Sequence, residues 1–74
     1  MTAPNQSKPY GTWQNRAKVE KWELDERRNA LATFMIGETF AALPEQDRLD
    51  LAHQLAVMNE YSEVLGRRIA RFGA

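Results

Sequence analysis

The apolar residues of the C-terminal third recur at helical spacing. From residue 51 to residue 72, seven positions follow one another at intervals of four and three residues: Leu51, Leu55, Met58, Ser62, Leu65, Ile69 and Phe72. Only Ser62 is not apolar. This spacing places all seven on one face of a helix, a pattern typical of a helix that packs lengthwise against another helix.

A second, less regular apolar face predicts another helix upstream. Thr12 is a suitable N-cap and Gly37 a suitable terminator, so we expect this helix to run from Trp13 to about Ile36. Its apolar face consists of Ala17, Leu24, Leu31 and Met35, with Phe34 beside it. Lys21 and Arg28 also fall on this face, where they need polar partners or a route to solvent.

The segment between the two helices is short. We expect residues 38–43 to form a connection with one short helical turn and Phe40 tucked under it. Pro44 suits the first turn of the second helix, which should extend to about Phe72. Gly66 within that helix is expected to mark the close approach of the neighbouring helix, with the approach of a ligand as the alternative. The predicted fold is all-α: an antiparallel two-helix hairpin over residues 12–74, preceded by a flexible N-terminal arm over residues 1–11.

The chain is small, which favours self-association. A domain of 74 residues without cysteine gains nothing from disulfides and buries little surface alone. Several apolar residues lie outside the two helix faces and predict the interface of a homo-oligomer, most simply a four-helix bundle: Val19, Trp22, Val57, Tyr61 and Val64. Exposed apolar residues are also common on protein surfaces, so the alternative is that these five residues are ordinary surface residues with no interface role.

The neutral net charge hides an asymmetry. An antiparallel hairpin brings the first and last residues together, and these carry six positive charges with no acid between them, on Lys8, Arg16, Lys18, Arg67, Arg68 and Arg71. Cations beside aromatic rings and a helix N-terminus are typical of nucleotide capture. The candidate ligand-binding residues are therefore Tyr10, Trp13, Arg16, Lys18, Arg67, Arg68 and Arg71. Alternatively, the C-terminal arginines only complement the dipole of their helix, and Trp13 and Phe72 cover the hairpin end.

Other chemistry finds little support in the sequence. The chain has one histidine, no cysteine, no glycine-rich phosphate loop and no nucleophile–base pair, so we expect no metal site, no cofactor and no enzyme activity. No apolar run is long enough to span a bilayer, and the N-terminus does not resemble a secretory signal, so we expect a cytoplasmic protein that binds no membrane. Duplex DNA is not an expected partner, because the basic charge is confined to one short end.

The chain resembles a family of small helical-hairpin proteins of tailed phages and prophages, over about residues 13–72. The resemblance rests on residues 16, 19–20, 23–25, 31, 34, 36, 40–43, 47–51, 54, 58, 61–62 and 65–69. Arg28 departs from it, since the family usually has an aliphatic residue there; this suggests that Arg28 faces a carboxylate or a bound anion. The build is similar to that of phage sponges that trap cyclic nucleotide or cyclic ADP-ribose immune signals in CBASS or Thoeris immunity.

Three functions follow as hypotheses. The first is a phage counter-defence protein in the host bacterial cytoplasm, an oligomeric sponge that sequesters a nucleotide immune signal without catalysis. The second is an inhibitor of a host defence protein, of anti-CRISPR or anti-restriction type, whose acidic loop end imitates nucleic acid. The third is a structural or regulatory hairpin that assembles only with itself.

Overall fold

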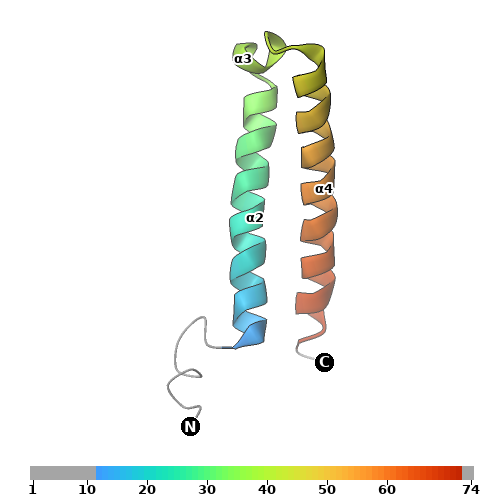
Figure 1. Ribbon diagram of the computed structural model, residues 1–74. Coiled ribbons are helices and arrows are strands. Elements are labelled where there is room, and N and C mark those ends of the chain that lie inside the picture. Colours follow the sequence, from blue (N-terminus) through green and yellow to red (C-terminus); the bar gives the residue numbers. More distant parts are fainter. Residues whose placement is uncertain (1–11, 73–74) are drawn as a thin grey trace.

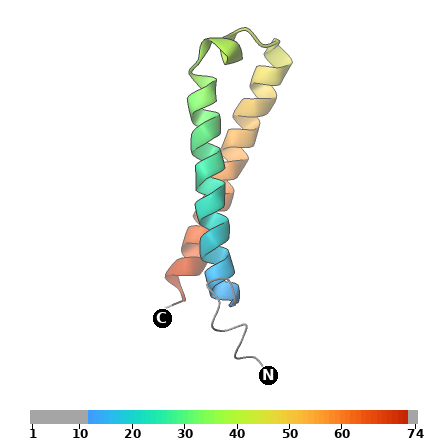
Figure 2. The ribbon, with the colours of Figure 1, turned by 90° about the vertical axis from the view of Figure 1, so that its left-hand side faces the viewer.

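The structure, a computed structural model, describes residues 12–72 and consists there of three helices. Helix α2 spans Trp13–Met35, α3 spans Glu38–Ala41, and α4 spans Glu45–Ala70. The chain turns back at α3, so that α2 and α4 lie side by side in opposite directions (Figure 1). Figure 2 shows that the two long helices cross at a shallow angle. The predicted all-helical fold with two long helices packed together is confirmed, whereas the predicted arm lies outside the described residues.

The helix ends follow the capping residues expected from the sequence. The Thr12 hydroxyl accepts a hydrogen bond from the Asn15 backbone N–H at 3.1 Å, as expected of an N-cap. Helix α2 ends with Ile36 as its C-cap, and Pro44 precedes the first residue of α4. Helix α4 ends at Ala70, two residues earlier than predicted, and Phe72 lies in the turn that follows.

The core between α2 and α4 is narrow. Among residues 12–72 the buried apolar side chains are Ala17, Leu24 and Leu65, of which only Leu65 is completely shielded from solvent. Ser62 is also buried, the other residues of the two predicted faces are half-buried, and Phe34 beside them is 39% exposed. Under the connection, the Phe40 ring meets the Phe34 ring edge to face at 6.1 Å, as predicted for Phe40. A core of this size leaves much of each long helix in contact with solvent.

A polar network interrupts the apolar interface and explains why Ser62 stands in an apolar face. The Lys21 ammonium donates hydrogen bonds to Asp25 Oδ2 at 2.9 Å and to Ser62 Oγ at 2.8 Å. The Ser62 hydroxyl in turn donates to Asp25 Oδ1 at 2.6 Å. These bonds, first that from Ser62 and then that from Lys21, hold the pKa of Asp25 below its ordinary value. Ser62 is only 4% exposed, yet its hydroxyl is fully engaged.

Two sequence expectations concern single residues on the helix faces. A Cβ built at Gly66 would meet the end of the Lys21 side chain at 3.6 Å, so the neighbouring helix approaches Gly66 through this side chain and not through its backbone. Within residues 12–72, Arg28 forms no salt bridge, and its guanidinium donates to the Asn29 amide oxygen at 3.3 Å. The Arg28 charge still contributes to the lowered pKa of Asp25, and contact of Arg28 with a bound anion stays a prediction.

Candidate functional site

The candidate site lies at the open end of the hairpin, defined here as the end where α2 begins and α4 finishes (Figure 1). The first residue of α2, Trp13, meets Phe72 from the turn after α4, with ring centroids 4.9 Å apart and an interplanar angle of 83°. This edge-to-face contact closes the apolar interface at the open end. Trp13 nevertheless remains 55% exposed, so much of its ring is available to a ligand.

A pocket of about 210 Å³ opens beside this aromatic pair. It is lined from α2 by Trp13 and Gln14, and from the end of α4 by Arg68, Arg71 and Phe72. Aromatic faces, an amide and two guanidinium groups thus converge from two chain segments more than fifty residues apart. This combination suits a ligand that has both an anionic group and a flat ring.

The charge at the open end is not neutralised locally. Within residues 12–72 the salt bridges join Lys21 to Asp25 and Arg27 to Glu23, both away from the pocket. Arg68 is half-buried and Arg71 is exposed, and neither forms an ion pair with an acid of the described segment. The pocket therefore offers two cations to an incoming anion.

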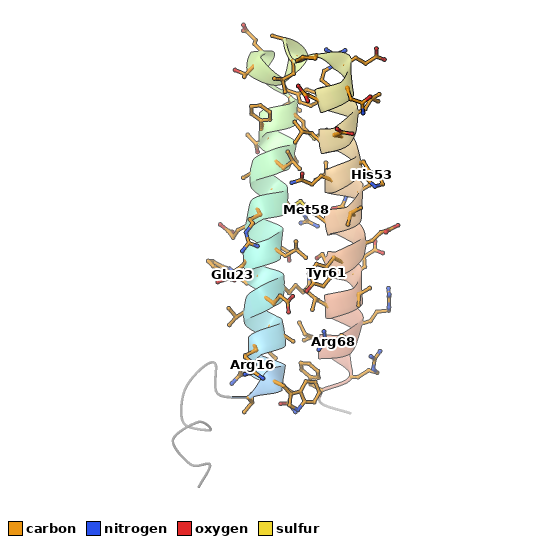
Figure 3. The ribbon with its side chains drawn as sticks, in the orientation of Figure 1. Arg16, Glu23, His53, Met58, Tyr61 and Arg68 are labelled. Carbon is orange, nitrogen blue, oxygen red and sulfur yellow. The ribbon has the colours of Figure 1, made fainter. Side chains whose placement is uncertain are left out.

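The structure brings together three of the predicted ligand-binding residues, Trp13, Arg68 and Arg71, in one pocket. Arg16, Lys18 and Arg67 are exposed at the same end but do not line it. Figure 3 shows Arg16 and Arg68 at this end, one on each long helix. Tyr10 lies outside the described residues.

Sequence reasoning missed Gln14 as a lining residue. Gln14 is uncharged and lies between the candidate residues Trp13 and Arg16, so a search of the sequence for cations and aromatic residues does not select it. Its signal is positional: in the first turn of α2 it is half-buried beside the pocket. An amide can donate to and accept from a nucleobase edge, so Gln14 adds a neutral hydrogen-bonding group to the cationic ones.

The residues predicted to form an oligomer interface divide between two faces. Val57, Tyr61 and Val64 are 48%, 41% and 40% exposed, and their spacing of four and three places them together on α4. Trp22 is 65% exposed and lies two residues before the buried Leu24, about 200° around the helix from it. Trp22 therefore faces away from α4, and Val19 stands beside it at helical spacing.

Other features bear on which classes of function the chain can perform. Over residues 12–72, no group of three or more His, Cys, Asp or Glu side chains is placed to hold a metal ion. None of the described helices has the length and apolar character required to cross a membrane.

Comparisons with known proteins give one family. No curated protein and no solved structure matches the chain. The model of the family described as Sequestin matches residues 11–71, which include both long helices and every lining residue of the pocket except Phe72. The family name suggests a protein that binds and sequesters a ligand or partner. With most of its length matched, the chain belongs to the Sequestin family.

Proposed function

We propose that this protein is a phage counter-defence sponge that sequesters a nucleotide immune signal, of cyclic oligonucleotide or cyclic ADP-ribose type, without chemical turnover. Membership of the Sequestin family supports sequestration as the mode of action. The resemblance to phage helical-hairpin proteins supports the counter-defence role and the bacterial cytoplasm as its place.

The observation that carries the proposal is the pocket at the open end. Arg68 supplies a cation for phosphate groups, Arg71 adds positive charge beside it, and the exposed part of the Trp13 ring supplies a surface on which a base can stack. The Gln14 amide is placed to hydrogen bond with the edge of such a base. An immune signal built from nucleotides has both chemical parts.

The size of the pocket limits how much of a ligand one chain can cover. Pockets that bury a drug-sized ligand measure about 300–1,000 Å³, whereas this one measures about 210 Å³. One hairpin therefore covers one base and its phosphate rather than a whole cyclic dinucleotide. We propose that the protein acts as a homo-oligomer, since the three buried apolar side chains of residues 12–72 also form a small core for a stable monomer.

Isothermal titration tests the binding proposal directly. The titrants are cyclic dinucleotides, cyclic trinucleotides and cyclic ADP-ribose variants, added to the full chain. The matched variants are Arg68→Ala, which removes a pocket cation, and Arg27→Ala, which removes an exposed arginine from the middle of α2.

We expect one of these nucleotides to bind, and Arg68→Ala to weaken its binding by about 10–100-fold, because a hydrogen bond to a charged group contributes about 1.5–3 kcal/mol. Arg27→Ala should bind like the unmodified chain. The proposal fails if no nucleotide in the panel gives a heat of binding, or if the two variants bind the nucleotide equally well.

The loop end, where α3 joins α2 to α4, favours a second candidate function. Ile36 is 87% exposed and Leu49 is 56% exposed there, close in sequence to Glu38 and Asp47. Exposed apolar side chains among acids suit a host defence protein as partner. Replacing Ile36 and Leu49 by Ser should then abolish inhibition of the host enzyme, whereas a nucleotide sponge would keep its activity.

A further inference from the structure

An exposed apolar stripe runs along α4 on the flank of its contact with α2. We define the α4 stripe as Val57, Tyr61 and Val64, which follow one another at spacings of four and three residues and are each at least 40% exposed. Figure 3 shows Tyr61 in the half of the helix that is nearer the open end. Such spacing on one face is typical of a helix that packs against a second helix, and α2 already occupies a different face of α4.

The stripe continues in both directions as a heptad series with charged ends. Asp50, Val57, Val64 and Arg71 are each seven residues apart, so they lie in one row along α4 that ends at its C-cap residue, Arg71. The row is acidic at its first position, apolar at its two central positions and basic at its last. All four side chains are exposed in the single chain.

This charge order distinguishes between two ways of pairing α4 with another α4. A parallel pair in register would place Asp50 beside Asp50 and Arg71 beside Arg71, which is unfavourable. An antiparallel pair centred between the valines places Val57 against Val64 of the second copy and Asp50 against Arg71. The antiparallel pair thus joins apolar to apolar and acid to base along the whole row.

We infer that the α4 stripe is the interface of a symmetric dimer, in which a second copy of this chain packs its own α4 antiparallel against it to form a four-helix bundle. This inference deepens the proposed self-association and does not depend on nucleotide binding. It assigns no interface role to Trp22 and Val19, which lie on the far face of α2. The single chain offers both Arg68 and Arg71 in the pocket; in the dimer Arg71 pairs with Asp50 of the second copy, and Arg68 is the cation left free to pair with a phosphate group.

Light scattering and sedimentation of the full chain give the first test. We expect a dimer, and Val57→Glu should convert it to a monomer, because a charge at the centre of the row meets apolar residues of the second copy. Trp22→Glu adds the same charge to an exposed site on the far face of α2 and should leave the dimer intact. Circular dichroism should show both variants as helical as the parent, since both side chains are largely solvent-facing.

A charge exchange tests the orientation. Asp50→Arg and Arg71→Asp should each weaken the dimer by about tenfold, since each pair occurs twice in a symmetric dimer and an exposed pair contributes up to about 1 kcal/mol. The double variant should recover the parental dissociation constant to within about threefold. Glu60→Gln should strengthen the dimer, because Glu60 on the outer edge of the stripe meets its own copy near the two-fold axis.

Cysteine cross-linking gives the decisive result, because the chain has no cysteine of its own. A mixture of Val57→Cys and Val64→Cys chains should form a mixed disulfide rapidly, whereas Val57→Cys alone should not. In the antiparallel dimer the two copies of residue 57 are about 10 Å apart along the axis, which exceeds the reach of a disulfide.

A monomeric parent overturns the proposed self-association. A dimer that Trp22→Glu disrupts and Val57→Glu does not, or one that cross-links through residue 57 alone, overturns this interface while leaving self-association in place.

Discussion

Replacing Ser62 by Ala should destabilise the protein, although serine stands where the apolar pattern calls for an apolar residue. The substitution removes a hydrogen bond received from the Lys21 ammonium at 2.8 Å and one donated to the Asp25 carboxylate at 2.6 Å. Hydrogen bonds to charged groups contribute about 1.5–3 kcal/mol each. Lys21 and Asp25 keep their own contact and are 32% and 28% exposed, so water replaces part of what is lost.

The expected net loss is about 1–2 kcal/mol, after allowing about 0.5 kcal/mol for the better helix propensity of alanine. For a chain of this size, that loss lowers the melting temperature by roughly 4–16 °C. The measurement is thermal unfolding followed by circular dichroism at pH 7 and one fixed protein concentration. Thr33→Ala is the matched control, since it removes an exposed hydroxyl from α2 and should change the melting temperature little.

The same variant has a defined dependence on pH. The pKa of Asp25 is lower in the folded chain than its ordinary value of 3.8, so the ionised carboxylate stabilises the fold above about pH 4. This contribution is lost as the pH falls through the folded pKa. Because the Ser62 bond is the largest cause of the lowering, the difference between the parent and Ser62→Ala should shrink from pH 7 to pH 2.

A second background tests whether the network acts as a unit. In a Lys21→Met chain, which keeps the aliphatic part of the side chain, Ser62→Ala should cost less than in the parent. The reasoning is refuted if Ser62→Ala melts at or above the parental temperature at pH 7. It is also refuted if the loss is the same at pH 7 and pH 2.

Three further changes test the local structure, each measured by urea unfolding at fixed protein concentration. Gly66→Ala should stabilise the chain by about 1 kcal/mol, because the added Cβ meets only Lys21 Cε at 3.6 Å; a loss of stability would contradict this. Thr12→Ala should cost about 1 kcal/mol through loss of the N-cap bond to Asn15, and an unchanged midpoint would show that the start of α2 contributes nothing. Arg48→Met should cost about 1 kcal/mol, because its guanidinium donates to the backbone carbonyls of residues 41 and 43; equal stability would exclude this bracing role.

The sequence predicts the fold well where spacing and capping residues carry the information. The apolar face of α4, the Thr12 cap and the turn around Phe40 all follow from local rules that act within a few residues. The helix ends at Ala70 and not near Phe72, because fraying at helix ends is not encoded in the spacing of apolar residues.

The polar network was less accessible from sequence. The spacing of four predicts that Lys21 can pair with Asp25, but not that both contact Ser62, which depends on how α2 and α4 are aligned. The same alignment decides that Gly66 meets a lysine side chain rather than a helix backbone. Contacts of this kind are properties of the pair of helices and cannot be derived from either one alone.

The candidate site was predicted in part. Folding the chain back on itself is enough to bring Trp13 near Arg68 and Arg71, and the charge count then identifies the open end. Which cations line the pocket depends on side-chain direction, and this leaves Arg16, Lys18 and Arg67 at its margin. Gln14 carries no charge, so only the three-dimensional arrangement identifies it.

The central claim is that the open end captures a nucleotide signal and holds it unchanged. The most direct measurement incubates the full chain with each candidate nucleotide, removes the protein by filtration, and then denatures the retained protein by heat and identifies what it releases. We predict that a nucleotide disappears from the filtrate in proportion to the protein added and is recovered chemically intact after heating, and that Arg68→Ala retains much less of it. A nucleotide that stays in the filtrate, or that is recovered as a cleaved product, would contradict the account.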